Sequence, residues 1–101
     1  MIKVDDYTLI VNTVVEDGVD TFKVRGFHAY KGLSVTGKPQ IRRDFFASII
    51  LKGDCAELRD RLEKSFDRKV KILLQTAELE LPYSNGRVLP ILKADSWKFA
   101  R

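Results

Sequence analysis

The sequence predicts a small all-β barrel of five strands with one short helix, and three observations lead to this fold class. The length of 101 residues suits one compact domain, 1–101, and leaves little room for two. Apolar residues make up 45% of the chain, which is enough for a hydrophobic core. Five segments have the composition of strands and one has helical spacing, in the order β-β-β-α-β-β.

The first half of the chain predicts three strands in a meander. The run YTLIVNTVV (7–15) is rich in β-branched residues, and acidic turn residues follow around Gly18. The second strand, TFKVRGFHAYK (21–31), alternates, and a loop with two glycines and a proline is expected at 32–40. The third strand is expected at 41–52, where one parity is apolar: Ile41, Phe45, Ala47, Ile49 and Leu51.

The period then changes to that of a helix, expected from about Asp54 to Asp67. Asp54 is a favourable N-cap, and Glu57 stands at the matching position of a capping box. Opposite charges lie at i,i+4 spacing on the surface, in the pairs Glu57–Arg61, Arg59–Glu63 and Asp60–Lys64. The apolar residues form a single stripe that would plug one end of the barrel: Cys55, Leu58, Leu62 and Phe66.

Two further strands complete the pattern. The segment 69–81 changes its apolar parity midway, which indicates a bulge or sharp coil, and PYSNGR (82–87) is a hairpin turn. The last strand, 88–100, contains Pro90, which marks an edge or a bulge. This order is that of the OB-fold, a five-stranded Greek-key barrel, although small α+β sheets share it.

Composition argues against several classes of function. One cysteine, Cys55, allows no internal disulfide, and one histidine, His28, makes a mixed His/Cys zinc site unfavourable. Glu78 and Glu80 have the spacing of a solvated strand face, so we expect no enzyme and no cofactor. No apolar run is long enough to span a bilayer, and the N-terminus lacks signal-peptide features. We therefore expect a cytoplasmic protein without a membrane role.

Charge is distributed unevenly along the first half of the chain. Residues 1–20 hold five acids and one base, whereas residues 21–43 hold six bases and no acid, within a net charge of +4. An acid-free basic segment is the electrostatic footprint that a polyanion requires, although a solvated basic face gives the same count. Its cations are Lys23, Arg25, Lys31, Lys38, Arg42 and Arg43.

Aromatic residues are interleaved with these cations in the second strand. Lys23 and Arg25 have the outward parity there. A regular pleat across Gly26 puts Phe27 on their face, whereas a bulge at Gly26, which a residue without Cβ readily permits, puts His28 and Tyr30 there instead. Either alternative predicts an aromatic ring among cations on the exposed face.

Two more aromatic residues bear on the same surface. Phe46 has the outward parity of the third strand, and Tyr83 and Arg87 flank the connection between the last two strands, where OB-folds often bind a strand. Burial in an oligomer interface or under a loop is the alternative role for an outward aromatic. Trp97 is expected to have a packing role.

The second half of the chain resembles a known family. The end, KADSWKF (93–99), resembles the Ala-Asp-x-hydrophobic-x-hydrophobic close of bacterial single-stranded-DNA-binding (SSB) proteins and their primosomal relative PriB. The stretch FFASIILKGDCAELRDRLEKSFDRKVKILLQTAELE resembles their middle, so that the resemblance covers Asp44 to about Phe99. The first strand lacks their Val-Gly-x-Leu signature, and Asp-Arg-Lys follows the helix where a glycine is usual.

The resemblance implies an OB-fold with a surface for single strands. Binding without sequence specificity requires cations along the phosphates and flat side chains for the bases. The expected function is thus single-stranded-DNA binding in replication, recombination or transfer, with RNA also open as the ligand. A protein-binding adaptor or inhibitor of a replication complex is the alternative. Proteins of this family form oligomers, so we expect a homo-oligomer, either a dimer or a tetramer. The strand pattern also leaves an open strand edge near Pro90, which a partner subunit would cover.

Overall fold

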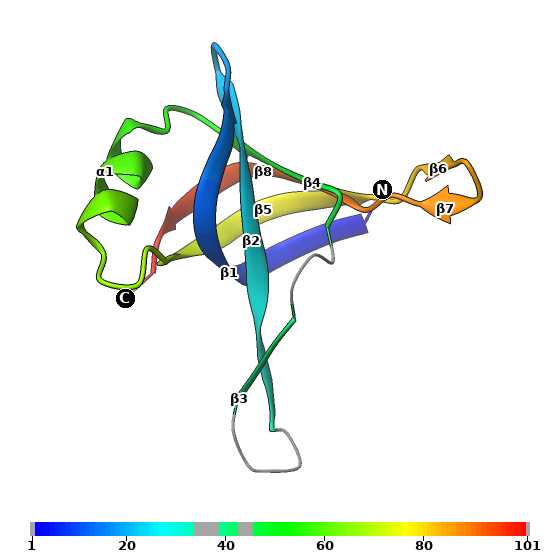
Figure 1. The fold of residues 1–101 in the computed structure, drawn as a ribbon. Helices are drawn as coiled ribbons and strands as arrows, with labels where there is room; N and C mark the ends of the chain where they lie inside the picture. The colour runs from blue at the N-terminus through cyan, green and yellow to red at the C-terminus, as the bar shows by residue number, and fades with distance from the viewer. Residues whose placement is uncertain (1, 34–38, 43–45, 101) are drawn as a thin grey trace.

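The computed structural model of the protein is a closed five-stranded β-barrel with one short helix, which confirms the predicted fold class (Figure 1). The structure describes residues 2–33, 39–42 and 46–100. For 27–33 and 39–42 it describes the backbone and its pairing only.

Five strands make up the barrel: β1 (Ile2–Asp17), β2 (Thr21–Leu33), β4 (Ser48–Lys52), β5 (Val70–Glu80) and β8 (Ile91–Phe99). They adjoin in the order β1-β2-β4-β8-β5, and β5 pairs with β1 to close the circle. β4 and β8 run parallel, whereas the other barrel pairs are antiparallel. This connectivity is OB-fold-like, because two antiparallel sets of strands meet at one parallel pair.

The third predicted strand is two strands in the structure. β3 (Pro39–Arg42) pairs with the far end of β2 and lies outside the barrel, and β4 begins only at Ser48. Ala47, predicted to point inward, is exposed, and its N–H donates to the carbonyl of Pro90 (2.7 Å). The alternation of 41–52 is therefore interrupted before β4.

The open edge expected near Pro90 is not present. Next to Pro90, residues Ile91–Ala94 of β8 pair with β4 on one side and with β5 on the other, so this end of the strand has no open edge. Pro90 precedes β8, where its missing N–H costs nothing and its carbonyl accepts bonds from Ala47 and from Ser48 (3.4 Å). The expected self-association therefore has no support from an open edge at this end of β8, and it stays a prediction.

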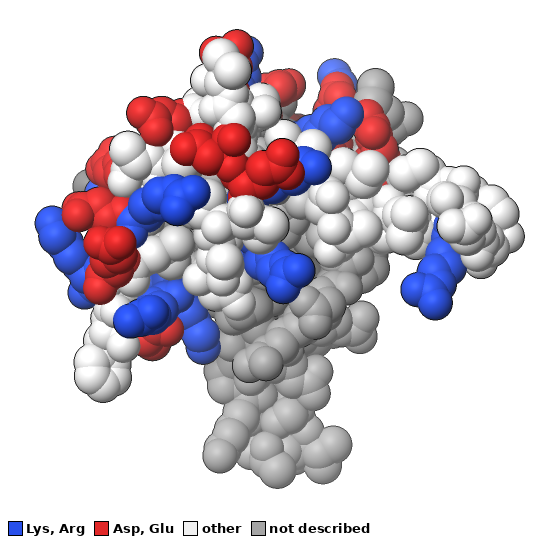
Figure 2. Space-filling model, turned by 45° about the horizontal axis from the view of Figure 1, so that its top comes forward, with Lys and Arg blue, Asp and Glu red and all other residues white. Residues whose placement is uncertain are grey.

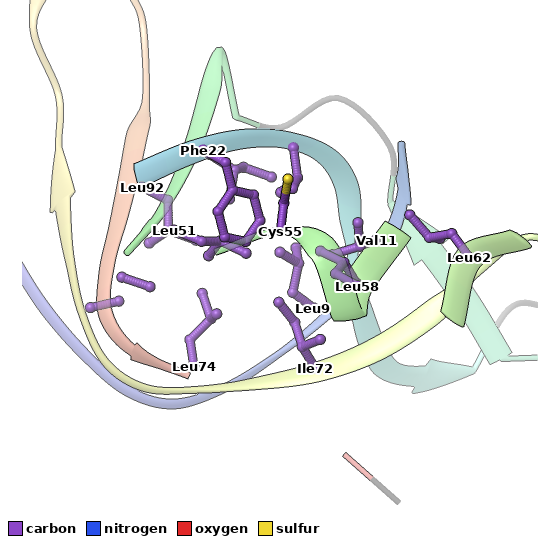
Figure 3. Close-up of a cluster of buried hydrophobic side chains, with 14 residues drawn as sticks. Leu9, Val11, Phe22, Leu51, Cys55, Leu58, Leu62, Ile72, Leu74 and Leu92 are labelled. Atoms are coloured by element: carbon purple, nitrogen blue, oxygen red, sulfur yellow. The ribbon is translucent and has the colours of Figure 1, made fainter. Parts of the chain in front are cut away.

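The core fills the barrel and continues under the helix (Figure 3). Leu9, Leu51, Ile72 and Leu74 are fully buried, and Phe22 is 2% exposed. They come from four different strands, so each strand contributes its inward parity to one cluster. This packing is the main source of the stability of the barrel.

The helix α1 (Ala56–Lys64) covers one end of the barrel and is shorter than predicted. Leu58 and Leu62 face the core, as expected. The capping box is not formed: Cys55 is the N-cap residue, and Asp54 Oδ1 instead accepts from the backbone N–H of Ala56 (2.9 Å). This bond closes the turn before the helix without the reciprocal contact from Glu57.

Phe66 is a correction to the predicted helical stripe. The helix ends at Lys64, and Ser65 is already extended, with ψ of 134°. The stripe therefore ends at Leu62, and the Phe66 side chain is fully exposed.

The last two strands agree with their sequence pattern. The buried side chains of β5 change from even to odd positions between Leu74 and Ala77. The register with β8 shifts at the same place, so the predicted bulge is confirmed. β6 (Tyr83–Ser84) and β7 (Arg87–Val88) form the predicted hairpin. Asn85 and Gly86 both have positive φ, 52° and 78°, as a two-residue hairpin turn requires.

The bulge beside Gly26 lies in β1 and not in β2. Val11 pairs with Gly26 and Thr13 pairs with Arg25, so Asn12 is the extra residue. Gly26 is required because the two backbones approach closely here. A Cβ at this position would lie 2.4 Å from the carbonyl oxygen of Ile10.

Gly26→Ala should therefore lower the free energy of unfolding by about 1–3 kcal/mol, because backbone must move to admit the methyl group. Chemical denaturation followed by circular dichroism measures the change. Lys71→Ala, at an exposed site on the strand next to Ile10, is the control and should change stability by less than about 0.5 kcal/mol. Equal stability of the two variants would contradict the close approach.

Candidate functional site

Cations gather on the outer surface of the second and third strands of the barrel. Phe22 and Val24 are buried, so Lys23 and Arg25 alternate with them on the outside of β2. On β4, Ile50 pairs with Lys23. The next outward residue, Lys52, is exposed and pairs with Thr21. We name the set Lys23, Arg25, Ile50 and Lys52 the β2–β4 face.

A shallow hollow adjoins this face on the side of β8. Ile50 also pairs with Lys93 across the parallel strands, so an apolar side chain lies between two lysines in one row. The hollow has a volume of about 260 Å³, and its lining includes Ile50, Lys52, Lys93 and Asp95. A partly buried isoleucine between cations offers apolar contact and charge at one place.

The cations of this region are weakly engaged. Lys23 lies 3.6 Å from Glu16 in an exposed pair, and Lys93 lies 3.2 Å from Glu80 in a pair that is partly exposed. Exposed ion pairs contribute ~0–1 kcal/mol, so a phosphate can replace the carboxylate at little cost. Arg25 and Lys52 have no ion pair with any residue that the structure describes.

The β6–β7 hairpin provides a second exposed surface. It projects from the barrel at the end opposite α1 (Figure 1). Tyr83 is 75% exposed, and Arg87 is exposed on the adjacent strand, paired with Ser84. Residues 81–90 contain no acid, and Figure 2 shows the hairpin as a largely white projection. Tyr83 is thus free to stack, with a cation nearby.

Phe46 does not have the outward position that parity predicted. Its side chain is half-buried against the core, and its ring meets that of Tyr7 edge to face, with centroids 6.0 Å apart. Burial raises the pKa of Tyr7 to about 12. The prediction was wrong because β4 begins at Ser48, so strand alternation does not extend back to Phe46.

Trp97 has the expected packing role. Its ring lies edge to face with Phe22 (5.8 Å) and with Phe99 (5.3 Å). The indole Nε1–H donates to the carbonyl oxygen of Lys52 (2.8 Å). This bond joins the end of β4 to β8.

Register supports one of the two alternatives for the second strand. Phe27 pairs with Ile10 and His28 with Leu9, without an extra β2 residue at Gly26, so the backbone favours the regular pleat there. Further along β2, the register with β3 shifts between Ala29 and Leu33. The side chains of the remaining predicted residues lie outside the described set: Phe27, Tyr30, Lys31 and Arg42, with Lys38 and Arg43 outside it entirely. Their roles stay predictions.

Sequence reasoning missed three residues of this surface: Ile50, Lys52 and Lys93. Lys52 has the same parity as Ile50, so continued alternation along the third strand was a usable signal. Lys93 gave no such signal, because the parallel pairing that brings it beside Ile50 joins segments far apart in the chain.

Comparison with known proteins adds no family: no family model, no curated protein and no solved structure matches this chain. In the described part of the chain, no helix has the length and apolar character needed to cross a membrane. The same residues contain no cluster of three or more His, Cys, Asp or Glu side chains placed to hold a metal ion. The fold and the exposed chemistry define an OB-fold-like barrel with a cationic outer face.

Proposed function

We propose that this protein binds single-stranded nucleic acid, with single-stranded DNA as the primary ligand, through the β2–β4 face and the β6–β7 hairpin. The observation that carries the proposal is the position of Lys23, Arg25 and Lys52. They lie on the outside of the second and third strands of an OB-fold-like barrel, which is the surface that OB-folds use for oligonucleotides.

The chemistry of the two surfaces is complementary to a single strand. The cations of the β2–β4 face contact phosphates, and the Ile50 side chain offers apolar contact to a base. Tyr83 stacks on a second base, and Arg87 follows the backbone beside it. Such contacts do not read sequence, so the role is general binding in replication, recombination or transfer, without catalysis or a cofactor.

Fluorescence-anisotropy titration with labelled single-stranded DNA, duplex DNA and RNA at two salt concentrations tests the proposal. Single strands should bind more tightly than duplex, and affinity should fall as salt rises, because bound cations release counterions. Tyr83→Ala should weaken single-strand binding by about 1–3 kcal/mol, the usual loss for one stacked base. Ser84→Ala, at the neighbouring exposed position, is the control.

Other titration results would indicate that these two surfaces bind a different ligand. Duplex that binds as tightly as single strand, or an affinity without salt dependence, would contradict the proposal. A protein partner is then the better candidate, because the hairpin also exposes apolar side chains: Leu81 47%, Val88 51% and Leu89 38%. Pull-down with replication proteins and sedimentation equilibrium would then separate an adaptor from a self-associating dimer or tetramer.

A further inference from the structure

A cleft of about 310 Å³ opens between α1 and β1, at the end of the barrel away from the hairpin. The last pair between β1 and β5 joins Val11 to Val70, so β1 continues beyond β5 through the bulge at Asn12. Asn12 and Val14 form one wall of the cleft, and Leu62 of the helix belongs to the other. Figure 3 shows Leu62 set apart from the other labelled core side chains.

Arg68 enters this cleft from a strained backbone position. Its φ is 54°, in the left-handed region, which is unfavourable for a residue with a Cβ. The turn that contains it is closed by other groups, because the Ser65 hydroxyl shares its one hydrogen between Asp67 Oδ1 (2.8 Å) and the carbonyl oxygen of Lys69 (3.0 Å). Glycine would satisfy this backbone at lower cost, so the fold itself gives no reason for an arginine.

Arg59 brings a second guanidinium to the same cleft. Its Nε–H donates to Cys55 Sγ (3.3 Å), which orients the group and leaves its terminal N–H groups for a ligand. The ion pair predicted between Arg59 and Glu63 is not formed. In the part of the chain that the structure describes, neither Arg59 nor Arg68 has an ion pair.

We propose that this cleft binds a nucleotide, with its phosphate held by Arg59 and Arg68. Two guanidinium groups suit a phosphate because each can donate two parallel hydrogen bonds. Val14 and Leu62 contact the flat apolar part of the base. Glu63 would repel a bare anion, but its carboxylate accepts hydrogen bonds from sugar hydroxyl or base amino groups, so a nucleotide fits better than inorganic phosphate.

The volume agrees with this ligand class, since small-molecule pockets start at ~300 Å³. The site is separate from the β2–β4 face, so it does not depend on the function proposed above. A phosphate next to a sugar and a base is present both in a free nucleoside monophosphate and at the phosphorylated end of a strand.

An NMR titration with deoxyadenosine 5′-monophosphate tests the site. The amide signals of Asn12, Thr13 and Arg68 should shift and saturate, and Arg68→Gly should weaken binding about 10- to 100-fold. The same variant should keep or raise the melting temperature, because glycine relieves the positive φ. Lys64→Ala removes an equal charge from the exposed end of the helix, outside the cleft, and should leave nucleotide affinity unchanged.

Several results would overturn the proposal. The nucleotide assignment is wrong if these amides do not shift, if inorganic phosphate or deoxyadenosine alone binds as tightly, or if Arg68→Gly melts higher yet binds equally well. A 5′-phosphorylated oligonucleotide that shifts the same amides, when its unphosphorylated form does not, identifies a strand end. If the mononucleotide shifts these amides and the phosphorylated oligonucleotide does not, the ligand is a free nucleotide. Oligonucleotide binding at the β2–β4 face should survive Arg68→Gly, so the two proposals fail separately.

Discussion

Phe22→Ala should lower the free energy of unfolding by about 3–5 kcal/mol, because the ring is 2% exposed at the centre of the barrel. Its removal leaves a cavity that the surrounding strands cannot close, and it ends the edge-to-face contact with Trp97. A domain of this size has ~5–15 kcal/mol in total, so the variant should unfold partly at physiological temperature. Urea denaturation followed by tryptophan fluorescence measures the loss.

The matched control is Phe66→Ala, which removes the same side chain from a fully exposed position. Its effect should stay within about 0.5 kcal/mol, since no buried area is lost. Helical spacing alone would place Phe66 in the apolar stripe with Leu62, so the two variants also test where the helix ends. A large loss from Phe66→Ala would mean that this residue packs against the barrel.

Local signals in the sequence predicted most of the fold. Alternation placed the five barrel strands, and the change to helical spacing placed α1, because both depend on residues close together in the chain. The parity change in β5 and the Asn85–Gly86 turn were predictable for the same reason. The split of the third strand was not, because it depends on Ala47 and Ser48 meeting the carbonyl of Pro90.

The candidate site was predictable only in part. Lys23 and Arg25 follow from simple alternation on β2, and the exposed Tyr83 follows from the hairpin turn. The outward position predicted for Phe46 was wrong because its ring packs against Tyr7, which comes from the start of the chain. Lys93 joins the surface through a parallel strand pair, which leaves no periodic trace in the sequence. Long-range contacts therefore account for the errors.

Replacement of Lys23, Arg25 and Lys52 together by glutamine should weaken single-strand binding about 10²- to 10³-fold at 50 mM salt. Each phosphate contact on a single strand contributes ~0.7 to the slope of log affinity against log salt, so the slope should fall by about 2. The three side chains point outward and carry no part of the core, so the melting temperature should change little. Anisotropy titrations across a salt series give both the affinity and the slope.

The control triple variant replaces Lys3, Lys64 and Lys98 by glutamine, which removes the same charge from a protein of net charge +4. These lysines are exposed but belong neither to the β2–β4 face nor to the hairpin. If binding follows net charge alone, both triple variants lose affinity equally, and no defined interface exists on β2 and β4. If the cations act by position, the control keeps the wild-type slope. A reduced slope for the β2–β4 variant alone, with both proteins folded, would place the phosphates along this face.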